Sequence, residues 1–563
     1  MNLTYFKDSC LFCFTFNNSK MNYKILLPAL LMLFAFTSCK DQLNVENPNQ
    51  PTPESAATQN GIIALGQGGV YISGFKGLDD KFNDGVPGYF WSGAMGMHSL
   101  LGDEVGEEAA NWFMNQIACP DEVILDNGTQ VLNPQSPSTQ YELIRSVNDN
   151  ANQGQNPTYH EWANMYSLNN ACNNMLSIVD KVPFASGREV KSNTIKAWAY
   201  WWKGFAYSRI GSMYYAGLIN DEPNKASNLF VTKEAIIAEA NSNFDKAATL
   251  LNGLSSGGDY DFIMEKLIPD FCQVGKGQVP TPDMWVRNIN TLKARNILVN
   301  TPVAAMSAAQ WNEVLTLTDN GIKETDMVFT GRSNTNGDIW SAQSGTVAAK
   351  TTGGPGINTY KLSERLVQDF KAGDKRKENN FEAGVAWIGN NDRGTIFNTR
   401  YGMLDGGAGI AGVIVYSDRE PGATELYLAG SFEENTLMNA EAKIYTNNID
   451  GGLTLIDQVR AAQGAGLSAT AGNGLSLAQA KEELRIERRC ALAFRGLAFY
   501  DARRWGITEK GGGRTGCVVV LSGTDISTNA TIRYNFLDYW DVPANELAYN
   551  PAGAGSAPTE NPK

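Results

Sequence analysis

Hydrophobic residues recur along most of the chain at the three- and four-residue spacing of a helix packed on one side. The clearest stripe lies in residues 232–252, and Thr232 stands before it as a residue that caps helix N-termini well. The stripe consists of Ile237, Ala240, Phe244, Ala247, Ala248 and Leu251. Residues 195–218 are apolar nearly all round, which is typical of a helix enclosed by neighbours. The pattern therefore predicts a mostly α-helical protein.

The predicted helices also follow one another in pairs. Residues 291–322 predict one helix–turn–helix unit, and residues 434–465 predict another with its turn at Gly451 and Gly452. Such pairs are similar to tetratricopeptide-type hairpins. Gly-rich segments bearing aromatic residues interrupt them at about 80–160 and 330–430, and long irregular segments are often functional. We expect a tetratricopeptide-like scaffold of helical hairpins with long irregular loop insertions.

The N-terminal region has a different pattern. From Met21, which we take as the start, a short polar stretch precedes a 12-residue apolar run at 25–36. A bilayer span needs about 20 apolar residues, so the run predicts a signal peptide rather than a membrane helix. Small residues then precede Cys39, and this arrangement is similar to a bacterial lipobox, in which the cysteine carries lipid. An ordinary cysteine behind a signal peptide is the alternative.

These boundaries predict three parts. Residues 1–38 are an upstream extension and a lipoprotein signal peptide, and residues 39–56 are a polar, proline-bearing tether that is lipidated at Cys39. Residues 57–563 form a single helical domain.

Charge and composition narrow the class of function. A formal net charge of −13 argues against a nucleic-acid-binding protein, which normally presents a basic face. The chain has only two histidines, His98 and His160, so a multi-histidine metal site is excluded. Its 12 Trp and 21 Tyr are better suited to stacking against flat apolar faces.

Six arginines lie within residues 485–506 of this acidic chain. Ser476 and Gln479 predict a capping box at the start of a helix, and Gly506 suits its end. Gly496 would lie in the helix interior, where it predicts a kink or a close helix contact. The charges are placed as an amphipathic helix requires, so we interpret the arginines as structural. A binding site for an anion is the alternative.

The same segment, IERRCALAFRGLAFYDARRWG, closely resembles the C-terminal signature of the SusD/RagB family, whose members are outer-membrane nutrient-binding lipoproteins. Ala491, Arg495 and Ala498 depart from the family pattern. The lipobox and the LLGDEVG turn at 100–106 are also similar to the family. The matching residues are Glu487, Arg488, Arg489, Leu492, Ala493, Phe494, Gly496, Asp501, Arg503, Arg504, Trp505 and Gly506.

The resemblance implies a SusD-like fold and a protein that is lipid-anchored in the outer membrane and exposed at the cell surface. It implies capture of an oligosaccharide, without catalysis, and delivery to a SusC-like TonB-dependent transporter on which the protein sits as a lid. A RagB-like importer subunit that binds peptide is the alternative. No cofactor is implied, although the family allows a bound calcium ion beside a loop.

Sugar rings present flat C–H faces to aromatic rings and hydroxyls to polar side chains, so we look for aromatic residues in the irregular segments. Aromatic residues of the 195–218 helix, such as Trp198, Trp201 and Trp202, are interpreted as core. The candidate ligand-binding residues are Trp112, Phe113, Trp340, Trp387, Asn390, Asp392, Arg393 and Tyr401. For each of them, anchoring of a loop is the alternative role.

A surface glycoside hydrolase is a further, less favoured hypothesis. It needs two carboxylates facing each other across a cleft, and no segment of the sequence demands such a pair.

Overall fold

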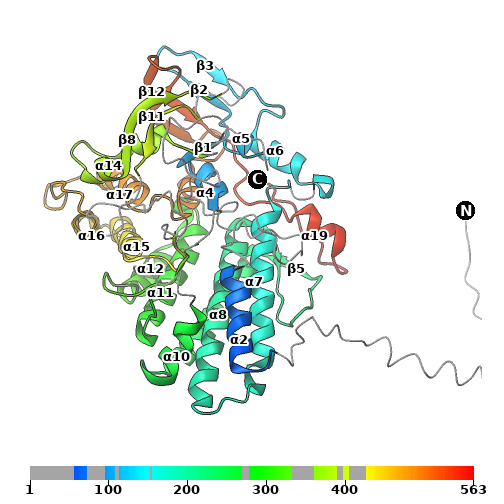
Figure 1. Cartoon of the computed structure of the whole chain (residues 1–563). Helices are drawn as coiled ribbons and strands as arrows, with labels where there is room; N and C mark the ends of the chain where they lie inside the picture. Colours follow the sequence, from blue (N-terminus) through cyan, green and yellow to red (C-terminus); the bar gives the residue numbers. More distant parts are fainter. Residues whose placement is uncertain are drawn as a thin grey trace, which may run out of the picture. The chain divides into compact units, whose positions relative to one another are not determined.

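The computed structural model describes residues 56–72, 95–107, 113–152, 155–268, 278–331, 360–389, 397–404 and 426–563, all within the unit Ala56–Lys563. Helices dominate these residues (Figure 1), which confirms the mostly α-helical class. The α-helices are α2 (Gln59–Gly66), α4 (Met95–Leu101), α5 (Met114–Ile117), α6 (Gln140–Val147), α7 (Tyr159–Ile178), α8 (Arg188–Met213), α9 (Lys233–Leu251), α10 (Gly258–Leu267), α11 (Pro282–Val299), α12 (Ala308–Asp319), α13 (Glu364–Asp369), α14 (Lys375–Asn380), α15 (Phe432–Tyr445), α16 (Ile449–Ala462), α17 (Leu477–Ala491), α18 (Ala498–Arg504) and α19 (Ala544–Tyr549).

The strands are short and form small antiparallel sheets. The largest described sheet has four strands in the order β11-β12-β2-β3, and the pairs β1-β7, β4-β5, β6-β10 and β8-β9 complete the set. The strands are β1 (Val105–Glu107), β2 (Glu122–Ile124), β3 (Gln130–Leu132), β4 (Ala216–Leu218), β5 (Phe230–Thr232), β6 (Thr330–Gly331), β7 (Tyr360–Leu362), β8 (Phe381–Trp387), β9 (Thr399–Met403), β10 (Leu426–Tyr427), β11 (Gly513–Val520) and β12 (Ile526–Arg533).

Helices that follow one another in the chain pack side by side. Helix α8 lies between α7 and α9, and α11 packs on α9 and α12. Helix α15 packs on α12, α16 and α17, so the hairpins form a continuous stack (Figure 1). This is the arrangement that the tetratricopeptide-like prediction describes. None of the described helices has both the length and the hydrophobicity that crossing a membrane requires.

Predicted helix starts are found where the capping residues stand. The Thr232 hydroxyl accepts a hydrogen bond from the Ala235 backbone N–H at the start of α9. At the start of α17, Ser476 and Gln479 form both hydrogen bonds of a capping box. Each bond satisfies a backbone group that the first helical turn leaves without an intrahelical partner.

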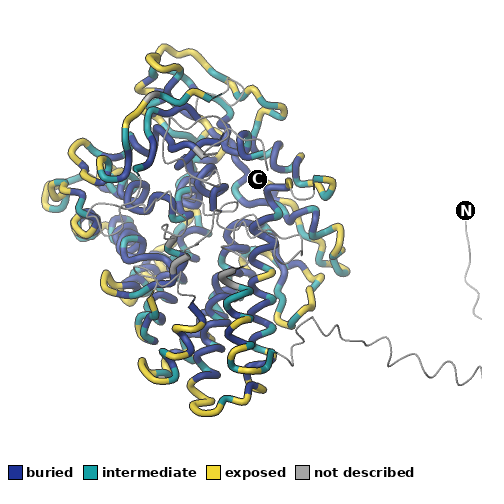
Figure 2. Tube along the Cα trace, in the orientation of Figure 1, coloured by how far each residue is buried: buried dark blue, intermediate teal, exposed yellow. Residues whose placement is uncertain are grey.

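The aromatic residues of α8 form the centre of the core. Trp198, Trp201 and Trp202 are fully buried, and the Phe329 ring lies 5.2 Å from Trp198 and 4.7 Å from Trp201, centroid to centroid. Trp285 of α11 completes the cluster. The buried part of the trace follows these helices (Figure 2). The interpretation of these tryptophans as core is confirmed.

Two predicted helix boundaries are wrong. The turn between α15 and α16 lies at 446–448, not at Gly451 and Gly452, because Asn447 takes a left-handed φ of 67° and Asn448 caps α16. Gly452 instead sits inside α16, where a Cβ would lie 2.5 Å from Ile444 Cγ1. The 195–218 helix also ends earlier than predicted, at Met213, and Ala216–Leu218 form β4 instead. The kink predicted at Gly496 is present between α17 and α18, where Phe494 and Gly496 have φ of 61° and 70°.

The described residues of 80–160 contain short helices and strands joined by irregular stretches. They form α4, β1, α5, β2, β3, α6 and the start of α7. The described part of 330–430 likewise contains β7, α13, α14, β8 and β9. Short strands that pair with distant segments leave no periodicity long enough to read from the sequence.

Candidate functional site

The arginines of the C-terminal signature are structural. Arg504 makes two hydrogen bonds to the Glu441 carboxylate, at 2.6 and 2.7 Å, and Arg488 makes two to Asp501, at 2.9 and 3.0 Å. Arg503 donates to three backbone carbonyl oxygens, including those of Ser212 and Val299. All three guanidinium groups are buried and occupied by the protein itself. The structural interpretation holds for these side chains.

The turn at 100–106 connects this signature to the region of the candidate ligand residues. Asp103, with a left-handed φ of 56°, accepts hydrogen bonds from Ser363 Oγ at 2.9 Å and Arg365 Nη2 at 2.7 Å. Arg489 donates to the Gly102 carbonyl oxygen at 2.7 Å. The neighbouring Glu104 accepts from the Phe494 backbone N–H at 2.7 Å, and burial raises the pKa of its carboxyl to about 7. The turn is therefore a buried junction and not a binding loop.

Trp387 and Tyr401 are the two candidates that the structure brings together. They lie on the β8–β9 hairpin, where Trp387 pairs with Thr399 and Tyr401 pairs with Ala383. Cross-strand partners point to the same face of a sheet, and so do residues two apart on one strand. Trp387 and Tyr401 therefore project from the same face of the hairpin, and both side chains are half-buried.

Polar and cationic groups surround these two rings. The Lys361 ammonium lies 5.3 Å from the Trp387 ring centroid, and the Arg400 guanidinium lies 5.8 Å from that of Tyr401. Lys377 is 5.5 Å from the same tyrosine ring, and Gln368 donates a hydrogen bond to the Tyr401 hydroxyl at 3.4 Å. An aromatic face with hydrogen-bonding groups around it can bind a polyol. The rings contact the C–H groups of the polyol, and the polar groups bind the hydroxyls of the polyol.

The hairpin is held rigidly at its end. Asn398 accepts a hydrogen bond from the Gly389 backbone N–H at 2.8 Å and donates one to the Val520 carbonyl oxygen of β11 at 2.8 Å. The backbone of Gly389 lies against Trp387, because a Cβ there would be 2.9 Å from Cη2 of the ring. A fixed ring loses little conformational freedom when a ligand stacks on it.

Phe113 is the third predicted site residue among those that the structure describes. Phe113 precedes α5 with a φ of 55°, and its half-buried ring packs against the main core. The other candidates lie outside the described residues, as does Cys39, and these are Trp112, Trp340, Asn390, Asp392 and Arg393.

Sequence reasoning missed the groups that surround the two rings. Arg400 adjoins Tyr401 in the chain and could have been included on that basis. Lys361, Gln368 and Lys377 come from β7, α13 and α14, and only the packing of those elements brings them to the hairpin.

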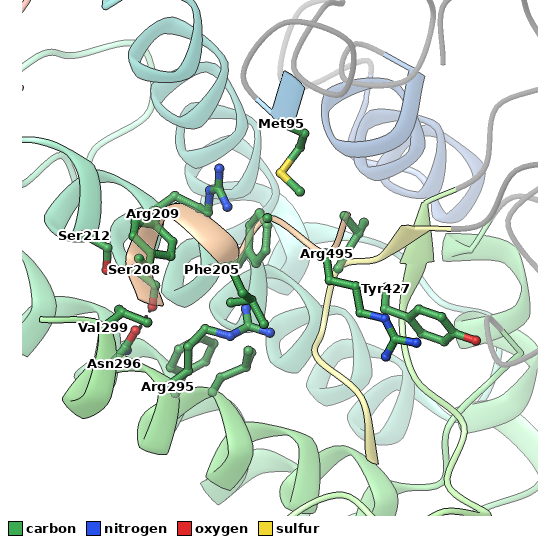
Figure 3. Close-up of a pocket in the computed structure, with 16 residues that line it drawn as sticks. Met95, Phe205, Ser208, Arg209, Ser212, Arg295, Asn296, Val299, Tyr427 and Arg495 are labelled. Carbon is green, nitrogen blue, oxygen red and sulfur yellow. Dashed lines mark hydrogen bonds between the residues drawn. The ribbon is translucent and has the colours of Figure 1, made fainter. Parts of the chain in front are cut away.

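Three arginines line a small cavity, which Figure 3 shows. Each has a carboxylate of its own, since Arg209 pairs with Glu161 at 2.6 Å, Arg295 with Glu434 at 2.6 Å and Arg495 with Glu433 at 2.9 Å. The cavity measures about 30 Å³, which suits water and is too small for a sugar ring.

Both histidines belong to the interior. His98 lies 2.9 Å from the Glu161 carboxylate, and burial lowers its pKa. Burial also lowers the pKa of His160 to about 4. Neither ring is exposed to a substrate. Across the described ranges, no three acidic, histidine or cysteine side chains gather as a metal site would require.

Comparison with known proteins gives a family match for part of the chain. The model of the SusD family matches residues 434–552. None of the curated proteins compared with the chain matches it.

The fold is similar to several solved structures. A SusD-like carbohydrate-binding protein from Bacteroides vulgatus is 15% identical with a TM-score of 0.52, covering 89% of this chain and 98% of its own. Surface glycan-binding protein A from Bacteroides fluxus is 12% identical with a TM-score of 0.52, covering 90% and 99%. A SusD-like protein from Bacteroides fragilis is 14% identical with a TM-score of 0.51, covering 81% and 92%. Residues 434–552, which include the C-terminal signature, are therefore similar to the SusD family, and the solved structures show a similar fold.

Proposed function

We propose that this protein captures oligosaccharides at the cell surface without altering them. The observation that carries the proposal is the Trp387–Tyr401 face of the β8–β9 hairpin, two half-buried rings with cationic and amide groups at their rim. The match of residues 434–552 to the SusD family supports it, and two of the similar structures are described as carbohydrate- or glycan-binding proteins.

The energetics favour a face of several rings over a single one. Covering roughly 100 Å² of a sugar's C–H face contributes on the order of 2–3 kcal/mol before the costs of association are subtracted. Useful affinity therefore needs more than one stacked ring, and the hydrogen-bonding groups select the orientation of the sugar. Binding of this kind uses no catalytic residue and needs no cofactor.

We further propose that the protein is lipidated at Cys39, exposed on the outer membrane, and acts as the lid of a SusC-like TonB-dependent transporter to which it delivers its ligand. The short apolar run before Cys39 supports export and anchoring. The similarity of residues 434–552 to the SusD family supports the transporter partnership.

The test is a panel of glycans and peptides presented to the purified protein, with binding measured by calorimetry and products examined for new reducing ends. We expect binding to at least one glycan and no new reducing ends. Binding to peptides alone would favour the peptide importer, and turnover that is lost on mutating one acidic residue would favour a hydrolase. For the partnership, co-purification of a TonB-dependent transporter with the tagged protein is expected, and its absence from membranes that contain both would contradict the lid.

A further inference from the structure

A cleft of about 820 Å³ lies between α13, one face of α17 and the first half of β11. Ligand pockets for small molecules span about 300–1,000 Å³, so the cleft can admit more than one sugar ring. Gln368 lines it and also donates to the Tyr401 hydroxyl, so the cleft begins one side chain away from the hairpin described above.

Most charges in the cleft wall are neutralised within the protein. Arg365 donates to Asp103 at 2.7 Å, and Arg485 donates to Glu482 at 2.7 Å. Lys371 pairs with Glu483, with one contact at 2.6 Å. These three cations hold the walls together, and a ligand would have to displace a carboxylate to reach them.

Arg514 is different. Its side chain is only 11% exposed, its Nε is buried, and no described group hydrogen-bonds to that atom. The nearest carboxylate oxygen, on Asp103, is 4.0 Å away and is already engaged by Ser363 and Arg365. Burial, and then the neighbouring Arg489 guanidinium, lower the pKa of Arg514.

A second cation in the wall also lacks a described carboxylate partner. The Lys481 ammonium lies over the Tyr445 ring, 4.1 Å from its centroid, and makes no ion pair with any group that the structure describes. The cleft therefore carries an excess of positive charge in a protein whose formal net charge is −13.

A buried arginine that hydrogen-bonds to no carboxylate is costly, since the charge has lost water without gaining a partner. Arg488 and Arg504 each bind a carboxylate through two hydrogen bonds, and Arg503 binds three backbone carbonyl oxygens. By contrast, Nε of Arg514 has no described hydrogen-bond partner. The buried Nε cannot reach a ligand, but the side chain keeps 11% of its surface and lines the cleft, so the terminal nitrogens of Arg514 can take a partner from a ligand.

We infer that this cleft binds the carboxylate of an acidic saccharide, with Arg514 as its principal partner and Lys481 as a second cation. Arginine presents a planar pair of donors that matches a carboxylate. Trp505 and Thr515 also line the cleft and can contact the sugar ring and its hydroxyls. The inference deepens the proposed function and rests on it for the saccharide part of the ligand.

The test uses calorimetry on the mature protein with uronic-acid oligosaccharides and with the same oligosaccharides after reduction of each carboxylate to an alcohol. We expect the acidic form of at least one to bind about tenfold more tightly than its reduced form, as a charge-assisted pair allows. Arg514→Gln should remove that difference, and Arg514→Lys should keep part of it. Arg485→Gln is the matched control, because it lines the same cleft but has its own carboxylate and should leave the preference intact.

Thermal melts separate a binding role from a structural one. Arg514→Gln removes an uncompensated buried charge and should leave the melting temperature unchanged or raise it, whereas loss of a structural arginine would lower it. Equal affinity for acidic and reduced oligosaccharides, or a preference that survives Arg514→Gln, would overturn this inference while leaving neutral-glycan binding in place. Failure of every glycan, acidic or neutral, would overturn the proposed function as well.

Discussion

Trp387 and Trp201 are the same residue type in opposite settings. Trp201 is fully buried in the aromatic core and donates a hydrogen bond from Nε1 to Asn288 at 2.9 Å. Trp387 is half-buried at the end of a strand, with the Lys361 ammonium 5.3 Å from its ring centroid. Removing the Trp387 ring should therefore affect ligand binding, whereas removing the Trp201 ring should affect the stability of the fold.

Trp387→Ala should weaken glycan binding by at least about tenfold, since a stacked ring contributes more than about 1.4 kcal/mol. Its melting temperature should change far less than that of Trp201→Ala, for which a loss of about 3–5 kcal/mol in the free energy of unfolding is expected. Calorimetry and thermal melts of both variants make the comparison. A large loss of stability in Trp387→Ala would reassign the ring to the core.

Glu104 makes stability depend on pH. Its folded pKa of about 7 lies above its ordinary value of 4.5, so the folded state binds more protons between these limits. The contribution of Glu104 to stability is therefore fully present below about pH 4.5 and is lost as the pH rises through 7. His160, whose pKa is lowered to about 4, acts in the opposite direction between pH 4 and 6.5.

The variant Glu104→Gln separates the effect of Glu104 on the pH dependence of stability from the effect of His160. Glu104→Gln keeps an acceptor for the Phe494 N–H but cannot ionise, so its stability relative to the wild type should rise between pH 5 and 8, by up to about 3 kcal/mol. Chemical denaturation at several pH values measures the difference. A difference that does not vary with pH would mean that Glu104 does not titrate in this range.

At the scale of elements, the break between α17 and α18 depends on Gly496. Its φ of 70° favours glycine, and a Cβ would lie 2.4 Å from Met95 Cε. The break turns the chain so that Arg488 of α17 meets Asp501 of α18, 13 positions further along the sequence.

Gly496→Ala should destabilise the protein more than Gly474→Ala. Gly474 has a similar φ of 68° but nothing within 4 Å of the added Cβ, so its substitution reports the backbone strain alone, about 1 kcal/mol. The excess in Gly496→Ala reports the crowding against Met95. Denaturant titration of both variants measures it, and equal losses would show that the methionine moves aside without cost.

At the scale of the whole molecule, the proposed lipid anchor depends on the sulfur atom of Cys39. Cys39→Ala should move the protein from the membrane fraction to the soluble exported fraction, because no described helix can span a bilayer. Thr37→Ala is the control, since it keeps a small residue before the cysteine and should leave the protein attached. Fractionation followed by immunoblotting checks both, and membrane attachment of the alanine variant at 39 would contradict the lipoprotein prediction.

The helical scaffold could be read from the sequence because its determinants are local. Apolar stripes of period 3.6 predicted α8 and α9, and Ser476 with Gln479 predicted the start of α17 from four residues. Boundaries set by left-handed residues such as Asn447 and Phe494 were missed, because a side chain other than glycine gives no sequence signal for a positive φ.

The candidate site depends on tertiary packing much more than the helices do. Trp387 and Tyr401 were chosen from the sequence as aromatic residues in a polar setting, but only strand pairing puts them on one face. Lys361, Gln368 and Arg514 acquire their roles from segments far away in the chain. Local periodicity governs which residues form helices, whereas the position of one charge relative to another is decided by contacts between residues that are distant in sequence.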